Sequence, residues 1–200
     1  MSQPNKRFLI TQSLISSWEY SFVKDGGYQD FLKTLYRERT PPTTAMLNGQ
    51  WFENVVNSVC NGIEISESHE WYRPVTELAD TLTGAQQQVK LSRNLTVNGI
   101  TFVCYGILDF LKAGIIYDTK YSKTYHVGKY LNSPQHSMYF YLVPEARQFT
   151  YLICDGKYVY RETYYPDETE PIEKIIERFM DYLDKKDLVT TFCENWRSKY

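Results

Sequence analysis

The stretch Tyr105–Tyr121 (YGILDFLKAGIIYDTKY) constrains the fold more than any other part of this 200-residue sequence. Apolar, β-branched and aromatic residues dominate it, and a break that contains glycine divides it in two. This pattern predicts a β-hairpin, with one extended segment at Gly106–Leu111, a turn at 112–114 and a second extended segment at Ile115–Lys120. Both segments are apolar enough to be buried in a core.

Two carboxylates and a lysine stand inside these otherwise apolar segments. A buried ionised group is costly unless it is paired or holds a metal. If the hairpin closes around residues 112–113, Asp109 lies near Asp118 across the ladder. Lys120 projects from the same face as Asp118, because side chains on a strand repeat with period two. A divalent cation between the two carboxylates would remove their repulsion, and an ammonium group beside them suits phosphodiester hydrolysis. The rival interpretation is an exposed ion pair of Asp118 and Lys120, worth under about 1 kcal/mol.

Hydrophobic periodicity predicts the remaining elements. Helices are expected at Ile10–Val23, Tyr28–Tyr36, Ala45–Asn61, Val75–Leu82, Leu131–Val143, Pro166–Asp184 and Leu188–Trp196. Strands outside the hairpin are expected at Gln87–Leu91, Gly99–Cys104, Gln148–Cys154 and Lys157–Tyr164. This order predicts an α/β fold in a single domain over residues 1–200, with a mixed central sheet flanked by helices on both faces.

Composition narrows the classes of partner. The net charge of −2 excludes a strongly basic nucleic-acid binder but leaves room for a local basic patch around the central hairpin, made of Lys112, Lys120, Lys123, Lys129 and Arg147. The four cysteines are far apart and include no CxxC pair, so a thiolate metal site is not expected. The polar start and the lack of a long apolar run predict an intracellular protein that has no membrane segment.

Five short motifs follow one another along the chain: ITQSLISSWEY from Ile10, Gly49-x-x-x-Glu53, Gly106-x-x-Asp109, Asp118-Thr119-Lys120 and Gln135-x-x-x-Tyr139. The ordered set resembles the PD-(D/E)xK nuclease superfamily, and within it the RecB-like and phage lambda exonuclease-like branch that includes Cas4-type nucleases. The likeness covers roughly residues 11–155. It implies a restriction-endonuclease-like fold with a catalytic core at about 45–160 and C-terminal helices at 166–198.

The sequence departs from the pattern of the family in two places. Leu108 stands where the superfamily usually has a proline before the first aspartate. Cas4-type enzymes bind an iron–sulfur cluster through one cysteine in the first helix and three near the C-terminus. Here the first helix has none and Cys193 stands alone near the end, so no iron–sulfur cluster is expected.

The resemblance implies a role for each residue of the acidic set. Asp109 and Asp118 would hold Mg²⁺ or Mn²⁺ with the backbone carbonyl of Thr119, because hard cations take oxygen ligands. Glu53 would hold the metal directly, through water, or hold a second ion; the alternative is a solvated helix residue. Lys120 would orient or deprotonate the attacking water and offset charge in the transition state.

Other residues are implied in substrate binding. Gln135 and Tyr139, one helical turn apart, would touch a phosphate or a base or fix the catalytic lysine, and the alternatives are polar filler and a core aromatic. Lys123 and Lys129 would contact phosphate, and the alternative is plain surface. Gly49 costs roughly 1 kcal/mol against alanine inside a helix, which suggests that another backbone or a ligand approaches it.

The implied function is a Mg²⁺- or Mn²⁺-dependent deoxyribonuclease, with an exonuclease of DNA recombination, repair or phage DNA processing as the leading form. The alternatives are a catalytically silent DNA-binding or protein-interaction module and a restriction-type endonuclease. The expected partner is DNA, and a single-strand annealing or recombination protein and a homo-oligomer are compatible with the branch. The expected location is the cytoplasm of a bacterial or phage-infected cell.

Overall fold

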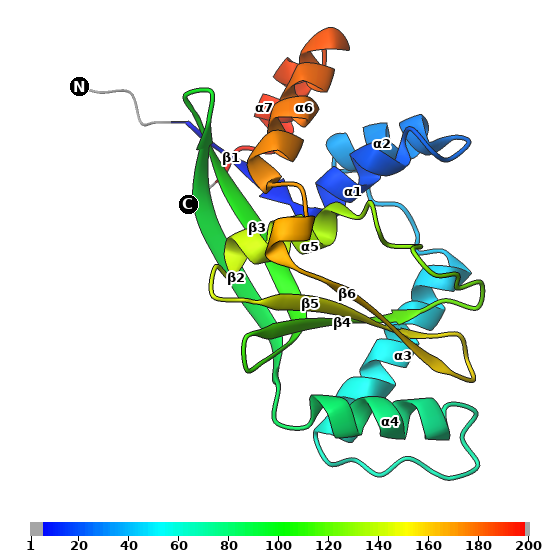
Figure 1. Cartoon of the computed structure of the whole chain (residues 1–200). Coiled ribbons are helices and arrows are strands. Elements are labelled where there is room, and N and C mark those ends of the chain that lie inside the picture. The colour runs from blue at the N-terminus through cyan, green and yellow to red at the C-terminus, as the bar shows by residue number, and fades with distance from the viewer. Residues whose placement is uncertain (1–5, 199–200) are drawn as a thin grey trace.

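The computed structural model describes residues 6–198 (Figure 1). The long strand β3 (Ile100–Lys112) lies at the centre of its sheet and pairs with three other strands. The six strands are β1 (Arg7–Thr11), β2 (Gln86–Val97), β3 (Ile100–Lys112), β4 (Ile115–Tyr121), β5 (Gln148–Cys154) and β6 (Val159–Tyr164). Their order is β1-β3-β4-β5-β6, and β2 pairs with the other edge of β3. The β1–β3 and β4–β5 pairs are parallel and the others antiparallel, which confirms the predicted mixed sheet.

Two tight turns set the register of the antiparallel strands around β3. Asn98 and Gly99 join β2 to β3 with φ values of 49° and 76°, and Ala113 and Gly114 join β3 to β4 with 50° and 75°. Two positive φ values in succession match the twist of a two-residue hairpin. The second turn therefore occupies residues 113–114, one position later than expected, and Lys112 pairs with Ile115.

Helices cover both faces of the sheet. They are α1 (Gln12–Tyr20), α2 (Gly27–Leu35), α3 (Thr44–Cys60), α4 (Tyr72–Leu82), α5 (Pro134–Leu142), α6 (Ile172–Lys185) and α7 (Val189–Asn195), with a 3₁₀ turn at Pro166–Glu168. Hydroxyl side chains cap three of them: Thr11 accepts from the N–H of Leu14, Thr43 from that of Met46, and Ser133 from that of Gln135. None of the helices in the described residues is both long and apolar enough to cross a lipid bilayer.

Several of the expected elements are wrong in extent. The expected helix at Ile10–Val23 begins only at Gln12, because Arg7–Thr11 alternates in burial and forms β1 along β3. The short strands expected at Gln87–Leu91 and Gly99–Cys104 are parts of a continuous pair of 12 and 13 residues. The expected long helix from Pro166 is a 3₁₀ turn followed by α6, which starts after Pro171.

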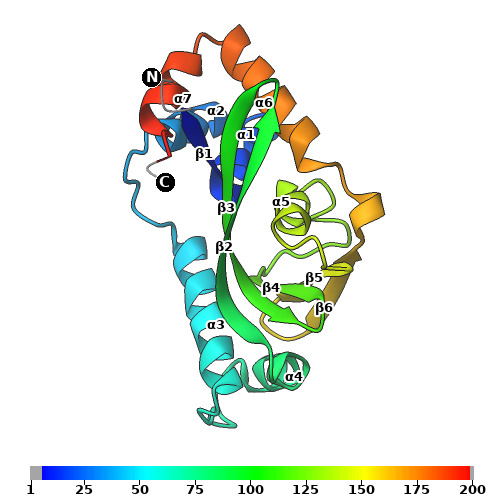
Figure 2. The same ribbon diagram turned by 90° about the vertical axis from the view of Figure 1, so that its left-hand side faces the viewer.

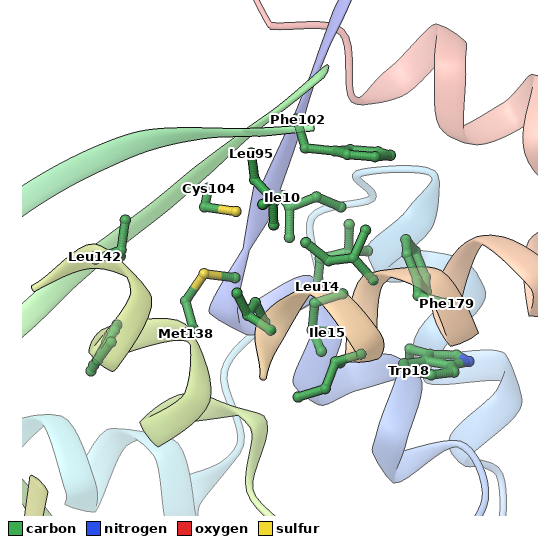
Figure 3. Close-up of a cluster of buried hydrophobic side chains, with 14 of the residues drawn as sticks. Ile10, Leu14, Ile15, Trp18, Leu95, Phe102, Cys104, Met138, Leu142 and Phe179 are labelled. Atoms are coloured by element: carbon green, nitrogen blue, oxygen red, sulfur yellow. The ribbon is translucent and has the colours of Figure 1, made fainter. Parts of the chain in front are cut away.

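Two hydrophobic clusters lie on the two sides of the sheet. The larger one packs α1, α5 and α6 against β1, β2 and the first part of β3, as Figure 3 shows for Leu14, Met138 and Phe179. The smaller one packs α3 and α4 against β5 and the end of β3. Leu108 belongs to the larger cluster and Phe110 to the smaller, so β3 contributes to both cores. Figure 2 shows β2 and β3 running from the end of the molecule with α6 toward the end with α4.

Candidate active site

The edge of β3 that faces β4 is open over four residues. On this edge β1 pairs with residues 101–105 and β4 pairs with residues 110–112. Between them, residues 106–109, the Gly-Ile-Leu-Asp motif, have no strand partner on this edge within the described chain, while β2 pairs with residues 106–108 along the other edge. Exposed backbone groups at such a gap must find other partners. The split in the sheet therefore puts the predicted motif where side chains can reach the backbone.

Helix α5 fills one part of the gap. The Tyr139 hydroxyl donates to the carbonyl of Ile107 at 2.7 Å. Its ring lies so close to Gly106 that a Cβ built there would be 2.6 Å from the ring carbon Cε1. Glycine is thus required at 106 by the close approach of the helix, and the first residue of one motif packs on the last residue of another.

Asp109 fills the other part of the gap. Its Oδ2 accepts from the backbone N–H of Thr119 at 3.0 Å and lies 3.4 Å from the Thr119 hydroxyl. The last recorded pair of the β3–β4 ladder is Phe110 with Tyr117, so Asp109 and Asp118 occupy the next facing positions. The carboxylate of Asp109 therefore takes the place of a strand partner for β4, and the two aspartates stand on adjoining strands.

Asp118 is the most buried acid of the site, with 2% of its side chain exposed. Its Oδ2 lies 2.5 Å from Nζ of Lys120, whose side chain is 32% exposed. Its Oδ1 accepts from Nε2 of Gln135, the first residue of the helical motif. Tyr151 on β5 donates to Oε1 of Gln135 at 3.3 Å and fixes the orientation of that amide. Asp118 is thus held from two sides, by an ammonium that reaches the surface and by a buried amide.

Helix α3 brings Glu53 to the same place. A surface groove is lined by Gly49, Glu53 and Lys120 together with Pro42, Met46, Gln50, Thr119 and Tyr121. Oε1 of Glu53 accepts from Nε2 of Gln88 at 2.8 Å. Within residues 6–198, no atom outside the local turn of α3 comes within 4 Å of the position where a Cβ would stand on Gly49, so no other described backbone approaches this glycine. The groove over Gly49 leads to the ammonium of Lys120.

The charges of the site act on one another. Burial, reinforced by the negative charge of Asp118, raises the pKa of Asp109 well above its usual range, against the opposing effect of Lys120. Burial and the charge of Asp118 also raise the pKa of Glu53. For Lys120, burial favours the neutral amine, but Asp118 and Asp109 outweigh it and the pKa is raised. The acids repel one another and hold the ammonium in its charged form.

These acids offer a hard cation two carboxylates at facing positions, with a third nearby. Within residues 6–198, no three side chains of His, Cys, Asp or Glu lie closely enough to enclose a metal ion. Mg²⁺, however, is commonly held by one or two carboxylates, with waters and substrate phosphates completing its shell. The donor set is all oxygen, and within residues 6–198 Lys120 is the ammonium that pairs with Asp118, so Asp109 and Asp118 fit a divalent cation. Glu53 and Thr119 line the groove beside them.

The expected substrate residues divide into two groups. Gln135 and Tyr139 are buried, with 6% and 4% of their surface exposed. Both side chains form their hydrogen bonds with other groups of the protein. In this structure Gln135 bonds Asp118 and Tyr139 bonds the backbone of Ile107, so both side chains support the residues around the acidic set. Lys123 and Lys129 are exposed on the loop 122–133 between β4 and α5, and Nζ of Lys129 donates to Ser122 Oγ at 2.6 Å.

Several residues of the site were not anticipated. Gln88, which bonds Glu53, has a φ of 50° inside β2 and no side-chain pattern marks it. Tyr130 stacks on Tyr151 with ring centroids 4.6 Å apart. Glu162 is a buried carboxylate on β6, and the alternation that buries Tyr164 two residues later was a signal for it.

Comparison with known proteins returns little at the level of sequence. No protein-family model matches the chain, and no curated protein matches it. Among solved structures, the crystal structure of SSO0001 is similar over 92% of this chain and 79% of its own, with a TM-score of 0.48 and 16% sequence identity. A likeness at this level carries no argument about activity.

Proposed function

We propose that this protein is a metal-dependent deoxyribonuclease that hydrolyses phosphodiester bonds, and that it acts as an exonuclease on DNA ends in recombination, repair or phage DNA processing. One observation carries the proposal: Asp109, Asp118 and Lys120 meet at a split in the sheet, beside a groove that also contains Glu53. The resemblance of the ordered motifs to PD-(D/E)xK nucleases supports the same chemistry.

Each residue of the set has a task in such a reaction. A divalent cation bound to Asp109 and Asp118 would supply a water of lowered pKa and would stabilise charge on the phosphate. Gln135 holds the Asp118 carboxylate in one orientation, and Asp109 is held by the N–H of Thr119. Fixed ligands of this kind are what a metal site needs from its surroundings.

Lys120 carries a positive charge into the site. In the metal-free protein Asp118 and Asp109 outweigh burial and raise its pKa, which keeps the ammonium charged. A charged donor can orient a water and offset the negative charge that builds on a phosphate in the transition state. Orientation and charge stabilisation are the tasks that a charged ammonium can perform, and they are the role proposed for Lys120.

The test is digestion of end-labelled linear DNA with Mg²⁺, with and without a chelator. Wild-type protein should release nucleotides only with the metal. The rate of release should fall about 100-fold or more in Asp118→Ala and in Lys120→Ala, which is the range for losing a charge-stabilising group. Lys186→Ala, on an exposed helix end away from the groove, is the matched control. Unchanged digestion by Asp118→Ala or Lys120→Ala would remove the assignment.

Closed circular DNA separates the exonuclease from its rivals. An exonuclease leaves the circle intact, whereas a restriction-type endonuclease cuts it with the same chemistry. A silent module would bind DNA and leave both substrates intact in Mg²⁺ and in Mn²⁺. The Lys120 ammonium already pairs with Asp118, so this last outcome would mean that the ion pair takes the place of a cation.

A further inference from the structure

A buried carboxylate outside the acidic set anchors the loop 122–133. Glu162 on β6 is 8% exposed and accepts four hydrogen bonds. Three come from the loop: the Tyr125 hydroxyl at 2.9 Å and the backbone N–H groups of Gly128 at 2.8 Å and Tyr130 at 3.4 Å. The fourth comes from the Tyr164 hydroxyl on β6 itself, at 2.8 Å.

Only an ionised carboxylate can satisfy this set of groups. Backbone N–H groups can donate but not accept, so each needs a lone pair, and both oxygens of Glu162 face such a group. A glutamine in the same place would point its NH₂ at one of the two N–H groups. The four bonds together outweigh the cost of burial and lower the pKa of Glu162.

The tethered loop lies against the proposed active site. The ring of Tyr130 stacks on Tyr151 with an interplanar angle of 28°, and Tyr151 donates to the Gln135 amide that holds Asp118. The ammonium of Lys120 lies 5.8 Å from the centre of the Tyr151 ring. A contact chain therefore runs from Glu162 through the loop and two stacked tyrosines to the acid and the lysine.

We propose that Glu162 is a positioning residue: its carboxylate ties the loop 122–133 to β6, and the tied loop holds the Tyr130–Tyr151 stack against Gln135 and Lys120. The tether itself can be measured without any substrate. Its effect on catalysis rests on the proposed function.

Hydrogen exchange read by mass spectrometry tests the tether. Glu162→Gln should raise exchange in the loop by about tenfold or more, the value of one bond to a charged acceptor, while β5 and α5 keep their protection. Glu177→Gln, the same change at an exposed position of α6, should leave the loop as in wild type. Unchanged loop exchange in Glu162→Gln would overturn the proposal.

Two tyrosine variants keep the test decisive if Glu162→Gln does not fold. Tyr125→Phe removes one loop bond to Glu162 and should raise loop exchange by a smaller factor. Tyr164→Phe removes a bond to the same carboxylate that does not involve the loop, so its loop exchange should stay close to wild type. Equal effects of the two variants on the loop would contradict the tether.

Digestion kinetics test the consequence for the site. Glu162→Gln should lower kcat by about tenfold and leave Mn²⁺ affinity unchanged, because the groups that bind the metal remain. Wild-type kcat with a loosened loop would sink the positioning role. If wild-type protein digests no DNA, the proposed function fails, and the exchange experiment still decides whether Glu162 ties the loop.

Discussion

Replacing Asp109 with asparagine should make the protein more stable. The pKa of Asp109 is raised by burial and by Asp118, so its ionised form is held at a cost in the folded state. Side chains at facing positions of adjoining strands are about 5 Å apart, and two like charges at that distance repel by about 3 kcal/mol at an effective dielectric constant of 20. Lys120 offsets part of this repulsion.

The free energy of unfolding is therefore expected to be about 1–2 kcal/mol higher for Asp109→Asn than for wild type at neutral pH. The asparagine keeps an oxygen that can accept from the N–H of Thr119, so the local backbone bond survives. For a chain of 200 residues, such a gain corresponds to a rise in Tm of about 2–8 °C. Asp25→Asn, at an exposed loop position, is the control and should leave Tm unchanged.

The gain should depend on pH and on metal in a defined direction. An acid whose pKa is raised on folding costs stability only where it is ionised. The stability difference between variant and wild type therefore opens as pH rises above 3.8, the ordinary pKa of Asp, and stops growing once pH passes the raised folded pKa. Mn²⁺ should stabilise wild type by about 2.7 kcal/mol at a hundredfold excess over Kd and close the gap at neutral pH. A less stable variant in metal-free buffer would refute the reasoning.

Three further predictions concern the surroundings of the acids. Gln135→Leu should lower the free energy of unfolding measured in urea by about 1–3 kcal/mol, because Asp118 loses a buried hydrogen-bond donor. An unchanged free energy of unfolding would contradict this. Gly106→Ala should lower the free energy of unfolding by about 1–3 kcal/mol, because the added methyl group overpacks the contact with Tyr139. Gly49→Ala has open space around it and should raise the free energy of unfolding by up to about 1 kcal/mol. Equal effects of the two variants would be inconsistent with the packing described. The pKa of Glu162 is lowered in the folded protein, so the bonds of its carboxylate stabilise the fold fully above pH 4.5, the ordinary value for Glu. This stabilisation is lost as pH falls below 4.5 and through the folded pKa. The difference in Tm between wild type and Glu162→Gln should therefore stay constant above pH 4.5 and narrow below pH 4.5.

The strongly patterned parts of the fold could be predicted from sequence. Asn98-Gly99 marks a hairpin through the φ values that both residues adopt, and Gln148–Cys154 is a strand with the expected bounds. The hairpin that carries Asp109 and Asp118 could be predicted because two apolar segments flank a break that contains glycine. In these cases the local sequence and the tertiary structure favour the same conformation.

Other features depend on contacts that are distant in sequence. Arg7–Thr11 is a strand because β3 offers it an edge, and nothing in five residues distinguishes it from a helix start. The burial of Gln135 and Tyr139 follows from the split in the sheet, which local spacing does not reveal. The positive φ of Gln88 likewise arises within a strand whose neighbours fix it.

The most direct measurement is a calorimetric titration of metal-free protein with Mn²⁺ at neutral pH. Wild type should bind the ion, and Asp109→Asn and Asp118→Asn should each abolish or greatly weaken that binding, while Asp25→Asn binds as wild type does. Absence of Mn²⁺ binding by wild type, or binding that survives in both aspartate variants, would contradict a cation held between the two strands.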